Sequence, residues 1–109
     1  MANVDSVRRD AGDGGAALRR LSLRFVGQVQ GVGFRWNARN TARSVGTTGW
    51  VRNESDGSVT MELQGTDEQI AAFFGAFNRV YVHYPIEYVI DEKDEIPVHE
   101  SEHEFRVRL

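Results

Sequence analysis

The amino-acid sequence predicts an α+β fold with two helices packed on one face of an antiparallel β-sheet. Three observations lead to this prediction. Five segments alternate apolar and polar residues, two others carry apolar residues at helical spacing, and turn residues separate them. In chain order these segments read β-α-β-β-α-β, followed by a short final strand. That order is typical of a ferredoxin-like sandwich.

The first half of the pattern consists of a strand, a loop and a helix. Residues 21–26 form the first predicted strand, because two leucines and a phenylalanine alternate with other residues. Residues 27–33 contain three glycines and predict a tight loop. Residues 36–45 carry apolar residues at i, i+4 and i+7, and Gly46 supplies the stop, which predicts a helix.

A hairpin and a second helix follow. Residues 47–52 and 58–64 are predicted strands joined by an Asn-Glu-Ser-Asp-Gly turn. Thr66 and Gln69 fit a capping box that begins the second helix. The phenylalanines of this helix fall at helical spacing, so we expect them in the hydrophobic core. They are Phe73, Phe74 and Phe77.

The C-terminal part predicts two more strands. Residues 86–90 suggest the fourth strand, residues 91–104 an acidic, solvated loop, and residues 105–109 the closing strand. At the other end, residues 1–17 are polar and without periodicity, which predicts a flexible N-terminal tail. The predicted domain therefore covers residues 18–109.

Composition narrows the class of protein. The chain has 109 residues, of which 40% are hydrophobic and 27% charged, as in an ordinary single globular domain. No apolar run is long enough for a membrane-spanning helix, and no signal-peptide pattern begins the chain. The absence of cysteine excludes disulfides, thiolate metal sites and a cysteine nucleophile. We therefore expect a cytoplasmic protein.

Charge is unevenly distributed along the chain. Between Arg19 and Asn53 there are seven arginines and no acidic residue, whereas residues 86–104 hold eight acids and a single lysine. The net charge of −3 hides this segregation. The front half is expected to attract anions, although a solvated basic helix face gives the same pattern.

The glycine-rich loop ends at Arg35, directly before the first predicted helix. Glycines allow successive backbone N–H groups to point inward, and a helix N-terminus adds positive potential. A guanidinium at this place is suited to grip a phosphate with two donors. The loop lacks the Gly-Lys-Ser/Thr of a Walker P-loop and the third glycine of a dinucleotide fingerprint. From these residues alone, a phosphate site and a plain tight turn both remain open.

Two longer motifs resemble those of the acylphosphatase family. The first motif is Gly27-x-Val29-Gln30-Gly31-Val32-x-Phe34-Arg35. The second is Gly49-Trp50-Val51-Arg52-Asn53, followed by Gly57-x-Val59 and then Gly65. The resemblance covers residues 18–109. It implies a ferredoxin-like acylphosphatase that hydrolyses an acyl phosphate to a carboxylate and inorganic phosphate.

The resemblance also implies roles for particular residues. Arg35 matches the phosphate-binding arginine, and Asn53 matches the asparagine that positions the attacking water. The phosphate cradle would consist of backbone N–H groups of Gln28, Val29, Gln30, Gly31, Val32 and Gly33. No metal or other cofactor is implied, and neither a nucleic acid nor a membrane is an expected partner. The expected enzyme is a monomer that takes a small-molecule acyl phosphate.

Two residues depart from the family motifs. Phe25 stands where an aliphatic residue is usual, which repacking of the core should tolerate. Glu54 follows Asn53 where a small hydroxyl residue is common. A carboxylate there would repel a dianionic substrate unless it points to solvent or pairs with Arg52. Trp36 and Trp50 are expected to pack in the core or against the cradle.

The same residues fit other functions less well. An RNA-recognition module has the same element order, but residues 58–64 carry no aromatic residue for base stacking, and the net charge is negative. A non-catalytic anion-binding domain remains the alternative because of Glu54. A domain attached to a carbamoyltransferase is disfavoured, because the chain ends after the last strand, which suggests a free-standing protein. His99 and His103 have metal-ligand spacing, but they lie in the predicted acidic loop.

Overall fold

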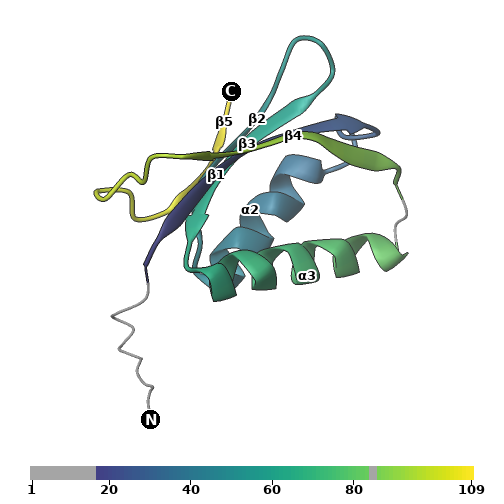
Figure 1. The fold of residues 1–109 in the computed structure, drawn as a ribbon. Helices are drawn as coiled ribbons and strands as arrows, with labels where there is room; N and C mark the ends of the chain where they lie inside the picture. Colours follow the sequence, from purple (N-terminus) through teal and green to yellow (C-terminus); the bar gives the residue numbers. More distant parts are fainter. Residues whose placement is uncertain (1–16, 84–85) are drawn as a thin grey trace.

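The computed structural model of the chain describes residues 17–83 and 86–109. Five strands form one sheet, and two helices cover one of its faces (Figure 1). The elements in chain order are β1 (Arg19–Gly27), α2 (Phe34–Val45), β2 (Thr48–Asn53), β3 (Val59–Gly65), α3 (Asp67–His83), β4 (Tyr88–Ile96) and β5 (Phe105–Arg108). The predicted ferredoxin-like fold is confirmed. The tail predicted for residues 1–17 lies, except for its last residue, outside the described residues.

The strands lie in the order β4-β1-β3-β2-β5. Neighbouring strands are antiparallel except β2 and β5, which are parallel, so the sheet is mixed rather than fully antiparallel. The register explains this direction. Ile96 at the end of β4 pairs with Arg20, and Thr48 at the start of β2 pairs with Gln64, at the same end of the sheet. The chain crosses that end and therefore enters β5 in the direction of β2.

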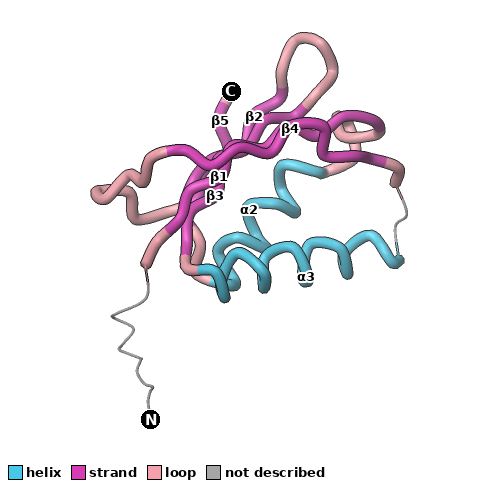
Figure 2. Tube along the Cα trace, viewed as in Figure 1, coloured by secondary structure: helices cyan, strands magenta, loops and turns pink. Residues whose placement is uncertain are grey.

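The hydrophobic core lies between the sheet and the helix layer (Figure 2). Every second residue of β1 faces it, and Leu23 and Phe25 are fully buried. Phe73 and Phe77 of α3 are also fully buried, with ring centroids 5.3 Å apart, while Phe74 packs partly buried against the core. The expectation that these phenylalanines belong to the core is confirmed.

The ends of the helices follow the predicted signals. Thr66 N–H donates to Gln69 Oε1 at 2.9 Å, and Gln69 N–H donates to Thr66 Oγ1 at 3.2 Å, which completes the capping box of α3. Gly46 ends α2 in the left-handed conformation, with φ of 81°. None of the described helices combines the length and the apolarity needed to span a membrane.

The acidic segment after residue 90 differs from the prediction. Residues 91–96 are not a loop but the continuation of β4, paired along β1. Residues 91–96 of this edge strand show no alternation of apolar and polar residues. Ion pairs with side chains of β1 hold the strand in place of apolar contacts. Arg19 pairs with Glu95 at 2.8 Å, and Arg24 pairs with Asp91.

Residues 97–104 are held against the sheet face that the helices leave open. Arg20, which is fully buried, donates to Glu102 Oε1 at 2.7 Å and to Oε2 at 3.1 Å. Gln64 exchanges two hydrogen bonds with the His99 backbone, at 2.9 and 2.8 Å. The loop is therefore docked rather than solvated throughout, and within residues 17–83 and 86–109 no three His, Asp or Glu side chains gather as a metal site.

Candidate active site

The loop of residues 28–33 connects β1 to α2 and is fixed at its start. Gln28 N–H donates to the Glu87 carbonyl at 2.7 Å, and Glu87 N–H donates to Gln28 Oε1 at 2.8 Å. Val29 N–H donates to the Gly27 carbonyl at 3.0 Å, and the Val29 side chain is buried. The backbone N–H groups of Gln28 and Val29 are thus occupied. Both amides therefore donate within the protein in this structure, and their role as phosphate donors stays a prediction.

The middle of the loop is held by the Gln30 side chain. Its Nε2 donates to the carbonyls of Glu54 and Ser58, each at 2.8 Å. Both carbonyls belong to the β2–β3 turn, which begins directly after Asn53. Gln30 therefore fixes the loop relative to the strand end that carries Asn53.

The remaining N–H groups of the loop are available to an anion. Among the described residues, no hydrogen-bond acceptor meets the N–H groups of Gln30, Gly31, Val32 or Gly33. Gly31 and Gly33 have φ of 77° and 76°, the left-handed conformation that a concave row of amides requires. Gly33 is also the N-cap of α2, and no side chain of the described residues caps the helix there. The positive end of the helix is open at this loop.

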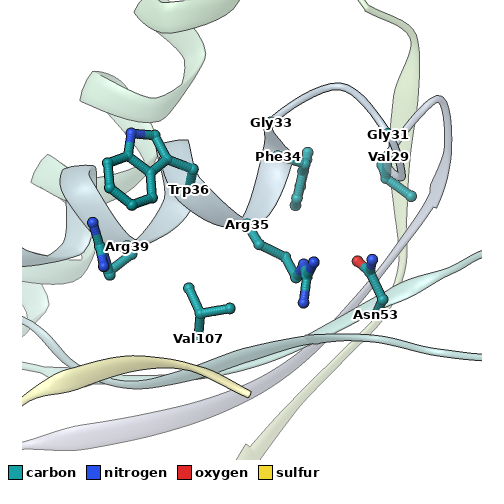
Figure 3. Close-up of a pocket in the computed structure, with 9 residues that line it drawn as sticks. All are labelled: Val29, Gly31, Gly33, Phe34, Arg35, Trp36, Arg39, Asn53 and Val107. Atoms are coloured by element: carbon teal, nitrogen blue, oxygen red, sulfur yellow. The ribbon is translucent and has the colours of Figure 1, made fainter. Parts of the chain in front are cut away.

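Arg35 and Asn53 meet beside this loop. The Arg35 side chain extends from the first turn of α2 toward Asn53, which stands at the end of β2 (Figure 3). Arg35 Nη1 donates to the Arg108 carbonyl at 3.3 Å, which leaves most of its five donors open. Asn53 Oδ1 is buried and has no hydrogen-bond partner among the described residues. Such a group calls for a polar partner, and a water molecule would supply one.

A hollow of about 370 Å³ joins these groups. Its lining residues are Val29, Gly31, Gly33, Phe34, Arg35, Trp36, Arg39, Asn53 and Val107 (Figure 3). The hollow therefore combines an arginine, open amides and an asparagine, which suits a phosphate-sized anion together with a water molecule. Its described lining contains no carboxylate, histidine or lysine that would act as a general acid or base.

Comparison with known proteins decides the family. The sequence pattern that defines the family described as Acylphosphatase matches residues 21–107. This chain belongs to the acylphosphatase family.

Individual acylphosphatases support the assignment. An acylphosphatase of Nitratidesulfovibrio vulgaris is 41% identical over 84 residues, which cover 77% of this chain and 82% of that protein. One from Salinibacter ruber is 50% identical over 58 residues, which cover 53% of this chain and 61% of that protein's length. The crystal structure of an acylphosphatase from Bacillus subtilis superposes with a TM-score of 0.66 at 25% identity. That match covers 85% of this chain and all of the other.

Glu54, which departs from the acylphosphatase motif, is turned away from Asn53. Its carboxylate accepts from Thr60 Oγ1 and from Arg52 Nε, the latter at 2.9 Å. Thr60 and, after it, Arg52 hold the pKa of Glu54 below its ordinary value. Of the two arrangements that would avoid repulsion, solvent exposure and pairing with Arg52, the structure shows the pairing. Arg52 and Thr60 are a cross-strand pair next to the pair of Asn53 and Val59, so the side chains that hold the Glu54 carboxylate point to the opposite face of the sheet from Asn53.

Four residues of the hollow lie outside the site residues predicted from the sequence: Phe34, Trp36, Arg39 and Val107. Trp36 was expected in the core or packed against the cradle, but it is 58% exposed and lines the hollow. Arg39 and Val107 line it as well. The i, i+4 spacing of Arg35 and Arg39 was a signal that both lie on one face of the helix. Nothing in the sequence indicated that β5 would bring Val107 there.

Proposed function

We propose that this chain is an acylphosphatase that hydrolyses the carboxyl–phosphate bond of small acyl phosphates. The observation that carries the proposal is the convergence, in one hollow, of the open amides of Gly31 and Gly33, Arg35 and Asn53 Oδ1, which has no hydrogen-bond partner among the described residues. This convergence occurs in a chain of the acylphosphatase family.

In the proposed reaction the phosphate lies in the amide cradle with Arg35 on its oxygens. Asn53 Oδ1 accepts a hydrogen bond from a water molecule and aims its oxygen at phosphorus. The new P–O bond forms as the bond from phosphorus to the acyl oxygen breaks, and the electron pair leaves with the carboxylate. Charge on the equatorial oxygens is stabilised by Arg35 and the amides, so positioning and electrostatics supply most of the acceleration.

The lining of the hollow fits this leaving group. A departing carboxylate has a conjugate-acid pKa of about 4, so its expulsion needs no protonation by the enzyme. The proton of the attacking water passes to a phosphate oxygen of the substrate. This route requires no acidic or basic side chain, and the described lining offers none.

The first test is hydrolysis of benzoyl phosphate by the purified protein in the presence of EDTA. We expect turnover by the wild type and a loss of at least about a hundredfold in kcat for Arg35→Ala, the size typical of a removed transition-state donor. Arg35→Lys should also be poor, because an ammonium lacks the two-pronged donor geometry. Asn53→Ala should lower kcat more than it raises KM.

The exposed Arg79 on α3 provides a matched control, because Arg79→Ala also removes one positive charge but lies outside the hollow. Full activity of Arg35→Ala would refute the site. A folded wild-type protein that binds inorganic phosphate but hydrolyses nothing would instead support the alternative, a non-catalytic anion-binding domain.

We also propose that the enzyme acts as a cytoplasmic monomer, with residues 18–109 as its catalytic unit. Every group of the hollow comes from one chain, so catalysis needs no second copy. A sedimentation mass near 12.3 kDa at assay concentration would agree with a monomer. Activity confined to a dimer fraction would contradict it.

A further inference from the structure

The arginines of residues 19–53 fall into two groups by their partners. Five of the seven form ion pairs with carboxylates among the described residues; these are Arg19, Arg20, Arg24, Arg43 and Arg52. Arg35 and Arg39 have no carboxylate partner in this part of the chain, and both line the hollow. In the proposed reaction Arg35 binds the phosphate, whereas Arg39 has no role.

Arg39 packs against Trp36 and forms no ion pair with any residue that the structure describes. Its Cζ lies 3.8 Å from the ring centroid of Trp36, so the guanidinium stacks on the indole. Within the described part of the chain, its buried Nε has no hydrogen-bond partner, and its Nη2 only reaches Asn40 Oδ1 at 3.5 Å. A partly buried cation with open donors is therefore presented to the hollow, fixed by an indole that is itself 58% exposed.

The position of Arg39 defines a second end of the hollow. Arg35 points toward Asn53, whereas Arg39 and Trp36 of α2 lie on the other side of Arg35, and Val107 of β5 lies across from this helix (Figure 3). Four residues of helix rise by about 6 Å, which is the length of a few covalent bonds. An acyl phosphate bound with its phosphate at Arg35 would extend its acyl group past Val107 toward Arg39.

We propose that Arg39, supported by Trp36, binds a second anionic group on the acyl part of the substrate. This inference rests on the proposed function and names its substrate class: acyl phosphates whose acyl group carries a carboxylate or another anion a few bonds from the carbonyl. A guanidinium with open N–H groups binds such an anion by donating charge-assisted hydrogen bonds to it. Val107 contacts the apolar atoms between the two charges.

The alternative is that Arg39 only adds positive potential and strengthens binding of every phosphate equally. Two stable phosphonates of the same length separate these explanations: 4-phosphonobutyrate, which ends in a carboxylate, and butylphosphonate, which ends in a methyl group. Calorimetry would measure the Kd of each for the wild type, Arg39→Gln and the control Arg79→Gln. Arg79 also lacks a carboxylate partner among the described residues and lies outside the hollow.

We expect the wild type to prefer 4-phosphonobutyrate by about tenfold, the size of one charge-assisted hydrogen bond. Arg39→Gln should abolish this preference, and Arg79→Gln should keep it. Equal weakening of both phosphonates in Arg39→Gln would overturn the inference. Absence of any preference in the wild type, including absence of measurable binding of either ligand, would overturn it too.

The same variants are then assayed with benzoyl phosphate and 4-carboxybenzoyl phosphate, a pair that differs only in the distal carboxylate. A higher kcat/KM for the carboxylated substrate, lost in Arg39→Gln mainly through KM, supports the subsite. Hydrolysis of both substrates without an Arg39-dependent preference refutes the subsite and leaves the proposed function standing. An Arg39-dependent preference among the phosphonates without any hydrolysis supports the second anion site and refutes the proposed reaction.

Discussion

Replacement of the buried Arg20 by methionine tests what fixes residues 97–104 to the sheet. The Arg20 side chain is fully inaccessible to solvent, and its donors reach Glu62 at 2.9 Å, Gln64 at 3.1 Å and Glu102 at 2.7 Å. The two carboxylate side chains keep 24% and 18% of their exposure. Methionine retains most of the aliphatic volume but leaves both carboxylates without their cation.

The expected loss follows from this geometry. Removing one partner of a buried ion pair costs about 3–5 kcal/mol, because the other charge stays desolvated. Glu62 and Glu102 keep some access to water, so we expect the lower end, about 3 kcal/mol. With a urea m-value of about 1.5 kcal/mol/M, the unfolding midpoint of Arg20→Met should fall by about 2 M.

Arg19→Met is the matched control. Arg19 is the neighbouring residue of β1 and also binds two carboxylates, Asp67 at 2.7 Å and Glu95 at 2.8 Å, but these pairs are exposed. Exposed pairs contribute little because water screens them. Its midpoint should therefore change far less than that of Arg20→Met. Equal shifts for the two variants would refute the argument that burial of Arg20 sets the cost.

The pH dependence gives an independent check. Burial alone would raise the pKa of Glu102, but the hydrogen bonds from Arg20 and its charge hold that pKa below the ordinary value of 4.5. A carboxyl with a lowered folded pKa contributes stability above its unfolded pKa and loses it as the pH falls through the folded pKa. The stability difference between wild type and Arg20→Met should therefore be constant near neutral pH and shrink below about pH 4.5. A difference that persists unchanged at pH 3 would contradict this linkage.

Three further substitutions are expected to separate fold from site. Gln30→Ala removes both hydrogen bonds that hold the cradle loop, so KM for benzoyl phosphate should rise about tenfold with little change in unfolding midpoint; an unchanged KM would contradict this role. Glu54→Gln should change kcat/KM by less than about threefold, because its charge is paired away from the hollow; a large gain would show that the carboxylate repels substrate. Gly49→Ala would place a Cβ 1.8 Å from the Glu62 carbonyl oxygen, so thermal unfolding should show that the free energy of unfolding falls by more than about 3 kcal/mol. In the control Gly57→Ala the new Cβ meets no described atom within 4 Å, and only the positive φ is unfavourable. The free energy of unfolding of this control should fall by only about 1–2 kcal/mol.

Local signals in the sequence were sufficient for most of the fold. The capping residues Thr66 and Gln69 bond as the pattern predicts, and Gly46 ends its helix in the left-handed conformation. These features depend on neighbours within a few residues, which a sequence displays directly. The acidic half of β4 depends instead on arginines about seventy residues earlier, such as Arg19 and Arg24. No local pattern of hydrophobicity reveals that kind of pairing.

The same distinction applies to the candidate site. Motifs named Arg35 and Asn53, and the structure brings both to one hollow. The motif also covers Gln28 and Val29. Whether their backbone N–H groups are free to bind an anion depends on which carbonyls of the surrounding segments lie close to them. The carbonyl of Glu87, the residue directly before β4, already accepts a hydrogen bond from the Gln28 N–H.

Ion pairing distinguishes two of the seven arginines in residues 19–53 as candidate residues for binding an anion. Arginine-rich composition alone predicts only a general attraction for anions. Once acidic residues from β3, β4 and residues 97–104 neutralise most of these cations, the positive potential that remains is concentrated on α2. Arg35 and Arg39 lie one turn apart there and line the same hollow. The acidic segments therefore support the proposed substrate site without contacting substrate, because, of the seven arginines in residues 19–53, they leave Arg35 and Arg39 without a carboxylate partner in the described part of the chain.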